Sequence, residues 1–189
     1  MDILKRSNIE DPKIQGYLEI LEAKAQRLKT LTEDVVEASK VSSGNINLQL
    51  MDVNLVEMMN QTTGEFAEKF EHKNLELIQT LPNEPAIIHV DGRRMWRVLE
   101  NLYNNAAKYA MPGTRIYADL RTDKDEVIFS LKNVSEYPLN FSADELTERF
   151  IRGDISRSTE GSGLGLSIAK SLVQMQGGKL ELLSLIHIS

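Results

Sequence analysis

Residues 100–109 read ENLYNNAAKY, and the fold is inferred outward from this stretch. Asparagine is a poor helix former because its side chain competes for backbone hydrogen bonds, yet three asparagines occur here. The apolar positions nevertheless predict a helix over 97–110, with Leu99, Leu102, Ala106 and Tyr109 supplying apolar surface. A helix that carries so many amides needs a reason other than helix stability.

The polar positions of this helix are regularly spaced. Asn101, Asn105 and Lys108 stand at i, i+4 and i+7, so they share one face. Amide oxygens are hard, neutral ligands that suit Mg²⁺, which is held by few protein groups plus waters and phosphates. A lysine on the same face is a point charge for a phosphate. The competing interpretation is a solvated polar face with local amide hydrogen bonds.

A second stretch, EGSGLGLSIAK at 160–170, places Gly161, Gly163 and Gly165 before a predicted helix over 163–176. Glycines let a backbone approach a ligand closely, and a helix N-terminus presents free N–H groups to phosphate. We expect Leu164 and Leu166 to anchor this loop on the core. The alternative is a flexible linker that enters a helix.

Taken together, the two stretches resemble the N box and the G2 box of the GHKL ATPase superfamily, in its sensor histidine kinase branch. The family pattern N-L-x-x-N-A-x-K-Y corresponds to NLYNNAAKY, and G-x-G-L-G-L corresponds to GSGLGL. ERF at 148–150 is similar to the F box, which precedes the mobile lid that the family closes over ATP. Order and spacing agree across residues 46–183.

The resemblance implies an α+β fold of the GHKL (Bergerat) type, a two-layer α/β sandwich with one mixed sheet and helices on one face. Residues 46–183 would be the ATP-binding catalytic domain. Residues 1–45 would be part of a dimerisation and phosphotransfer helical hairpin, whose second helix spans Pro12 to about Val41 with an apolar stripe and Asp11 as N-cap. A homodimer through this hairpin would form in the full-length parent.

The other elements are expected from period and turn residues. Strands are predicted at 46–53, at 75–81 and 86–90 around the turn PNEP, and at 177–182. Helices are predicted at 54–72 and 142–150, and Asp91 is expected to cap the helix that carries the asparagines. Residues 114–121 and 126–132 are predicted to form a hairpin across TDKD.

The resemblance also assigns roles to single residues. Asn105 would coordinate Mg²⁺, with Asn101 supporting the metal or the phosphates, while Lys108 would contact a phosphate and act in catalysis. The full set implied to bind the nucleotide is Asn101, Asn105, Lys108, Tyr109, Asn133, Gly161, Ser162, Gly163, Leu164, Gly165 and Leu166. Arg152 and Arg157 fall in the lid, where a guanidinium could neutralise the transferred phosphoryl group, and Arg157 is the catalytic candidate. Asn104 matches no family ligand, and we expect it to face solvent or to cap locally.

The chain departs from the family at the G1 box, usually D-x-G-x-G. Asn133 stands at the Asp position, and Ser135 and Tyr137 replace the glycines. An asparagine oxygen can still accept a hydrogen bond from the adenine amino group, although without charge. Asn133 as an ordinary turn residue is the competing interpretation.

The phosphoacceptor histidine of the family should precede the loop at 7–11, and none is found there. The three histidines are His72, His89 and His187, and none stands at a position that the family uses. We therefore expect this chain to bind Mg²⁺·ATP without phosphorylating itself. The tail LSLIHIS at 183–189 matches the translation of a transposon-end sequencing adapter. That match predicts a non-native tail over 184–189, with a native edge strand as the alternative.

Composition excludes several classes. A formal net charge of −6 argues against a nucleic-acid partner, and zero cysteines exclude disulfides and thiolate catalysis. No apolar run approaches a membrane span, so the chain is expected to be soluble and cytoplasmic, whereas the parent would be a bacterial membrane protein with this region in the cytoplasm.

The predicted function is Mg²⁺·ATP-dependent phosphoryl transfer to a histidine, with a response regulator as partner. One alternative is a GHKL ATPase that hydrolyses ATP. That class uses a glutamate at the first N-box position, which Asn101 occupies here, and Glu100 is one residue off register. The other alternative is a dimerisation or signalling module that does not respond to nucleotide.

Overall fold

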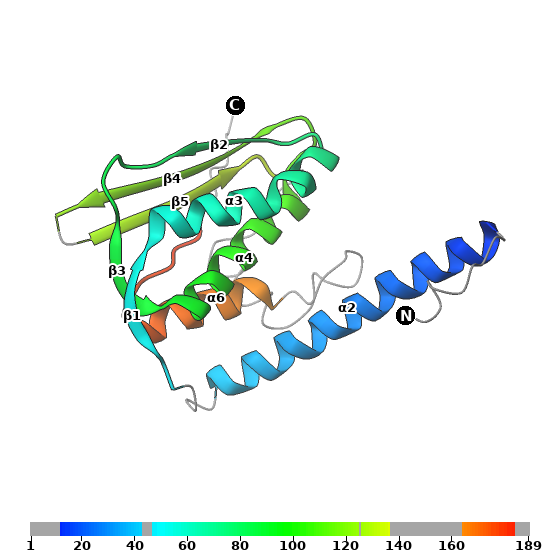
Figure 1. Cartoon of the computed structure of the whole chain (residues 1–189), viewed down its shortest axis with the longest axis horizontal. Helices are drawn as coiled ribbons and strands as arrows, with labels where there is room; N and C mark the ends of the chain where they lie inside the picture. Colours follow the sequence, from blue (N-terminus) through cyan, green and yellow to red (C-terminus); the bar gives the residue numbers. More distant parts are fainter. Residues whose placement is uncertain (1–11, 43–46, 125, 137–163, 184–189) are drawn as a thin grey trace.

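The computed structural model describes residues 12–42, 47–124, 126–136 and 164–183 (Figure 1). Its longest element is α2 (Pro12–Ser42), a helix of 31 residues that extends away from the rest of the molecule. The helix predicted from Pro12 to about Val41 is confirmed. The expected N-cap Asp11 and the preceding hairpin helix lie outside the described residues.

A three-stranded mixed sheet forms one layer of the α/β domain. Its strands are β2 (Glu76–Thr80), β4 (Arg115–Asp123) and β5 (Glu126–Asn133), in the order β2-β4-β5. β2 runs parallel to β4, with Glu76 beside Arg115. β4 and β5 are antiparallel from Ile116↔Asn133 to Asp123↔Glu126, which confirms the predicted hairpin.

A separate pair of strands joins the domain to the end of α2. β1 (Leu50–Asn54) is antiparallel to β3 (Ile87–Asp91), and no described residue links this pair to the larger sheet by strand pairing. The expectation of one continuous sheet is therefore wrong in this detail. β2 and β3 do flank the turn PNEP, but β3 pairs with β1 and not with β2. The N–H of Leu55 also binds the carbonyl of Ala86 at 2.9 Å, next to this pair.

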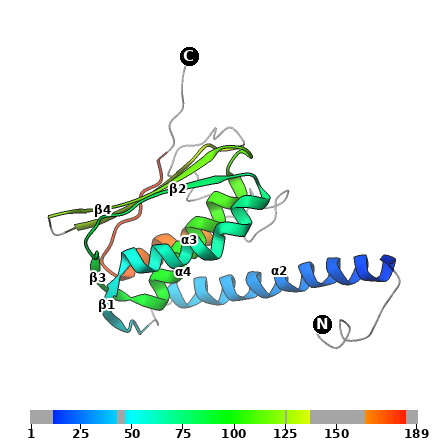
Figure 2. The same cartoon turned by 45° about the horizontal axis from the view of Figure 1, so that its top comes forward.

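Three helices cover one face of the larger sheet (Figure 2). They are α3 (Leu55–His72), α4 (Gly92–Tyr109) and α6 (Gly165–Met175). The core between the layers is built around Tyr103, which is fully buried and contacts the rings of Phe66, Phe70 and Phe129. The prediction of a two-layer α/β sandwich with helices on one face is confirmed.

Asp91 fixes where α4 begins. One carboxylate oxygen accepts a hydrogen bond from the N–H of Arg94 at 3.1 Å, and the other accepts from the N–H of Gln49 at 3.0 Å. Burial by itself would raise the pKa of Asp91, but these backbone N–H bonds and the charge of Arg94 outweigh it and lower the pKa. The N–H of Asp91 in turn donates to Gln176 beyond α6. The predicted N-cap is confirmed.

The strand predicted at 177–182 is wrong, because residues 178–183 form no strand. α6 ends where the N–H groups of Gln176 and Gly178 both bind the carbonyl of Val173, with Gly177 at φ +80°. Alternating apolar residues follow, but no described strand pairs with them. The helix predicted at 142–150 lies outside the part of the chain that the structure describes. Within that part, no helix is both long and apolar enough to span a membrane.

Candidate functional site

The candidate site is built on α4, which packs between α3 and α6 (Figure 1). Its apolar residues face the two neighbouring helices and the sheet, with Val98, Leu99, Tyr103, Ala106 and Ala107 buried. Asn101 is buried as well, whereas Asn105 and Lys108 are half-buried. The face predicted from the i, i+4, i+7 spacing therefore lies on a helix that is packed against neighbours on both sides.

Asn101 lies directly against the first residue of α6. A side-chain carbon added to Gly165 would lie 3.3 Å from Oδ1 of Asn101, so only glycine permits this approach without displacing the amide. The side chain of Asn101 is 8% exposed, and its Nδ2 has no hydrogen-bond partner among the described residues. A buried donor without a partner is costly. This donor is accordingly a candidate ligand-binding group.

The N-terminus of α6 is the second part of the site. Its N-cap, Leu164, has a helical backbone and provides no side-chain cap hydrogen bond. The first N–H groups of a helix without such a cap can bind an anion, and the helix dipole favours negative charge there. Leu164 packs against the buried cluster that contains Val98 of α4 and Ile168 of α6, and Leu166 is buried. Both leucines were predicted to anchor on the core.

The C-terminal end of α4 is the third part. The ammonium of Lys108 lies 4.6 Å from the ring centre of Tyr109, a cation–π contact. The carbonyl of Tyr109 accepts a hydrogen bond from the N–H of Glu136 at 2.8 Å, and the N–H of Met111 donates to Val134 at 2.9 Å. The segment that follows β5 therefore lies antiparallel against the end of α4.

Asn133 is the last residue of β5 and stands at the start of this segment. Its side chain is exposed, and its Nδ2 donates to the carbonyl of Val134 at 3.3 Å. The amide nitrogen thus has a local partner, and the amide oxygen is the group of Asn133 that could accept a hydrogen bond from a ligand. Asn133 thus lies near the C-terminal end of α4, whereas Gly165, far away in the sequence, lies beside Asn101 in the middle of that helix.

Several predicted residues lie outside the described part of the chain, namely Tyr137, Arg152, Arg157, Gly161, Ser162 and Gly163. Among the described residues, no group of three His, Asp or Glu side chains is placed to hold a metal ion. A divalent cation at Asn105 would therefore need oxygens from its ligand, such as phosphates.

A network of charged residues on the side of α4 toward α2 was missed by the sequence reasoning. The guanidinium of Arg97 binds Asp34 of α2 at 2.6 Å and Glu100 of α4 at 2.6 Å, and Arg94 binds Glu37 of α2. Burial alone would lower the pKa of Arg97, but its acidic partners outweigh burial and raise it. The i, i+3 spacing of Arg97 and Glu100 is the one sequence signal that could have predicted part of this charged network.

Asn104 points away from this site, toward α3. Its Oδ1 accepts an exposed hydrogen bond from the ammonium of Lys69, so the side chain reaches the surface as expected, but it binds a distant residue and does not cap locally. Burial lowers the pKa of Lys69, and the charge of Glu100 opposes this shift. The two neighbouring amides of α4 therefore differ in their surroundings. Asn104 links α4 to α3 through Lys69, whereas Asn105 lies on the face of the candidate site.

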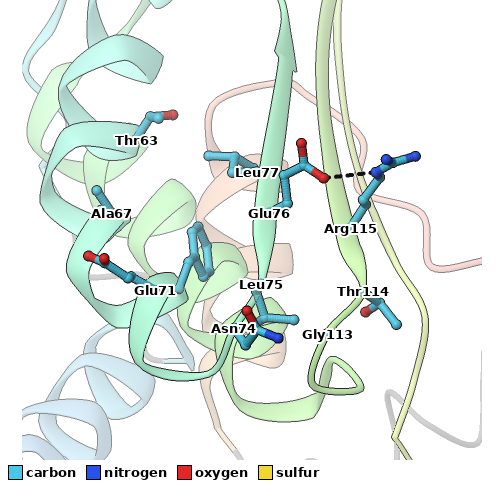
Figure 3. A pocket seen from close by; sticks show the side chains of 11 residues that line it. Thr63, Ala67, Glu71, Asn74, Leu75, Glu76, Leu77, Gly113, Thr114 and Arg115 are labelled. Atoms are coloured by element: carbon cyan, nitrogen blue, oxygen red, sulfur yellow. Dashed lines mark hydrogen bonds and ion pairs between the residues drawn. The ribbon is translucent and has the colours of Figure 1, made fainter.

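An open groove of about 840 Å³ lies elsewhere, between α3, β2 and the loop before β4 (Figure 3). Glu76 and Arg115 form an ion pair at its rim, with Nε and Oε2 2.9 Å apart. None of the predicted nucleotide residues lines it. His72 and His89 are also outside the candidate site, as exposed side chains next to Glu68 and Asp52.

Comparison with known proteins adds independent findings. Residues 90–186 match the family described as histidine kinase-, DNA gyrase B- and HSP90-like ATPase. The chain is 33% identical over 179 residues to the sensor protein VanSC of Enterococcus gallinarum, a match that covers 91% of this chain and 49% of that protein. The chain thus spans about half the length of this curated relative.

Two solved structures are similar in fold. Full-length ShkA in complex with AMPPNP superposes with a TM-score of 0.73 at 21% identity, over 88% of this chain and 35% of that one. The histidine kinase ThkA in complex with the response regulator TrrA gives a TM-score of 0.64 at 24% identity, over 93% of this chain and 49% of that one.

Proposed function

We propose that this chain, which belongs to the family of histidine kinase-, DNA gyrase B- and HSP90-like ATPases, binds Mg²⁺·ATP as the catalytic region of a sensor histidine kinase. The observation that carries the proposal is the buried Nδ2 of Asn101, which has no partner among the described residues and lies beside Gly165 at the start of α6. An oxygen-rich anion would satisfy this donor and the N–H groups of α6 together.

The residues present fit a nucleotide along α4. The phosphates would bind at the N-terminus of α6, near Asn101, with Lys108 as a further cation. Asn105 would supply a neutral amide oxygen to Mg²⁺, whose remaining ligands would be phosphate oxygens and water. The base would lie toward Tyr109 and the amide oxygen of Asn133. The cation would neutralise phosphate charge and orient the phosphates for attack.

The proposed reaction is phosphoryl transfer from ATP to a histidine, in which the protein mainly positions groups and neutralises charge. Lys108 would act on the phosphates in this step, and Arg157 of the lid would be its second cation. We infer a response regulator as the protein that next receives the phosphoryl group, because the related ThkA is solved with one. α2 would join a second copy of the chain, since its exposed apolar residues need a partner.

Hydrolysis of ATP is the less favoured function. It would require a carboxylate free to activate water, and Glu100 precedes Asn101 directly in the sequence. Its Oε2 lies 2.6 Å from Nη1 of Arg97, within the network that joins α4 to α2. A carboxylate held in such an ion pair is not free to take a proton from an attacking water. Phosphoryl transfer to a histidine therefore remains the better proposal.

Isothermal titration calorimetry tests the proposal directly. We expect the chain to bind Mg²⁺·ATP more tightly than Mg²⁺·GTP, and Asn105→Ala to remove the part of the affinity that depends on Mg²⁺. Asn104→Ala is the matched control, because it removes a neighbouring amide that faces Lys69 instead. Absence of measurable ATP binding by the wild-type chain would favour a module that does not respond to nucleotide.

A further inference from the structure

Lys73 occupies a position that neither the predicted motifs nor the proposed function explains. It is the C-cap residue of α3, and its half-buried side chain reaches across to the end of α4. There its ammonium donates to the carbonyl of Lys108 at 2.6 Å and lies 3.3 Å from Oε2 of Glu136. One side chain thus joins three segments that are distant in sequence: α3, α4 and the segment after β5.

The backbone around Lys73 is fixed on both sides. Asn74 adopts a left-handed conformation at φ +54°, and its carbonyl accepts a hydrogen bond from the N–H of Gly113 at 2.9 Å. The N–H of Glu76 binds the carbonyl of Thr114 at 3.1 Å. The turn between α3 and β2 is therefore attached to the loop between α4 and β4, and the direction of the Lys73 side chain is set by that attachment.

The charge of Lys73 has a specific task at the end of α4. A helix C-terminus carries partial negative charge on its last carbonyls, so cations are favoured there and carboxylates are not. Glu136 nevertheless places its carboxylate near these carbonyls, because its own N–H binds the carbonyl of Tyr109. The ammonium of Lys73 lies between the two negative groups and makes this arrangement favourable.

We propose that Lys73 is a positioning residue of the nucleotide-base site, because it holds residues 133–136 against the end of α4. This inference rests on the proposed function, in which Asn133 and Tyr109 flank the base. Without the ammonium, the carboxylate of Glu136 is repelled by the carbonyls of α4. The backbone N–H groups of Glu136 and Met111 then lose their carbonyl partners more often and bind water instead. A smaller fraction of the molecules then has the base-binding arrangement, and the apparent affinity for the nucleotide falls in proportion to that fraction.

The test compares Lys73→Met, which keeps the length of the side chain, with Lys73→Arg, which keeps the charge. Hydrogen exchange at the amides of Glu136 and Met111 is the first measurement and needs no nucleotide. We expect about tenfold faster exchange in Lys73→Met, and nearly wild-type exchange in Lys73→Arg. Lys179→Met is the matched control, because it removes an ammonium from an exposed ion pair with Glu181.

The second measurement separates the base from the phosphates. We expect Lys73→Met to weaken Mg²⁺·ATP about tenfold while leaving the affinity for Mg²⁺·tripolyphosphate unchanged. An equal loss for both ligands, or unchanged exchange at the two amides, overturns the positioning role. Glu136→Gln provides a second variant should Lys73→Met fail to fold, and it should loosen the same amides less. A wild-type chain that binds no ATP refutes the proposed function alone, since the exchange rates still decide the role of Lys73.

Discussion

At the scale of single residues, the contact between Gly165 and Asn101 gives the most direct prediction. An alanine at 165 would place its Cβ 3.3 Å from Oδ1 of Asn101, which forces the amide to move by a few tenths of an ångström. We expect Gly165→Ala to weaken Mg²⁺·ATP binding about tenfold, because both the amide and the N–H groups of α6 would be displaced. The dissociation constant from calorimetry is the measurement.

A matched glycine separates this effect from helix propensity. Gly64 lies within α3, and nothing lies within 4 Å of the Cβ that it lacks. Gly64→Ala should raise the free energy of unfolding by up to about 1 kcal/mol and leave nucleotide affinity unchanged. An equal loss of affinity in both variants would show that the Gly165 effect is not local.

Asp91 predicts a dependence of stability on pH. Burial alone would raise the pKa of Asp91, but backbone N–H groups that bind the carboxylate and the charge of Arg94 outweigh burial and lower the pKa in the folded state. Its contribution is therefore complete above the unfolded-state pKa, about 3.9, and is lost as the pH falls through the lower folded-state value. We expect Asp91→Ala to cost about 1–2 kcal/mol at pH 7, and the difference from wild type to shrink below about pH 4. Urea denaturation across this pH range measures it.

Residues with a local signal could be predicted, and those with a distant partner could not. The helical spacing placed Asn101, Asn105 and Lys108 on one face. Asp91 could be predicted as the cap of α4 because aspartate is a common N-cap residue directly before a helix. The partner of Asn104 was not predicted, because Lys69 stands 35 residues away in the sequence. Periodicity within one helix carries no information about which neighbouring helix supplies such a partner.

At the scale of elements, ion pairs join α2 to α4, and Arg97 makes the one that reaches a buried carboxylate. Arg97 binds Asp34, whose side chain is almost fully buried, and also Glu100. Arg97→Met removes one partner of an ion pair that includes a buried carboxylate, so we expect it to cost about 3–5 kcal/mol in unfolding free energy. Asp34→Asn in the same chain should recover part of this loss, which a double-mutant cycle by urea denaturation would measure.

An exposed ion pair is the control for this element. Arg115 pairs with Glu76 on the rim of the groove, and both side chains are more than half exposed. Arg115→Met should therefore shift the urea midpoint much less than Arg97→Met does. Equal shifts in the two variants would mean that the α2–α4 network contributes no more than a surface ion pair.

Elements were predicted well where one face of a segment must be buried. The periods of α3 and α4 and the β4–β5 hairpin follow from local pattern and turn residues. The pairing of β3 with β1 and the absence of a strand at 178–183 do not, because a strand exists only with a partner and the partner is not local. Alternation alone is equally compatible with a paired strand and with an extended segment.

At the scale of the whole molecule, α2 exposes an apolar surface that no described residue covers. Tyr17 and Leu28 are each 66% exposed, and Leu21 is 55% exposed. We expect reversible dimerisation, and Leu21→Glu with Leu28→Glu should shift the chain to monomer, because two charges cannot be buried in such an interface. Sedimentation velocity over a concentration series measures the shift. An unchanged affinity for Mg²⁺·ATP in the monomer would locate the effect in α2 alone.

The parallel pairing of β2 with β4 also constrains the order in which the chain can fold. Residues 81–114 lie between these strands, and they include β3 and the whole of α4. Closing so long a connection costs chain entropy before the strands can pair, whereas α4 and the β4–β5 hairpin can form from nearby residues. We therefore expect the larger sheet to be completed late in folding, after α4 has shortened the connection, and the candidate site on α4 to be assembled in the same late step.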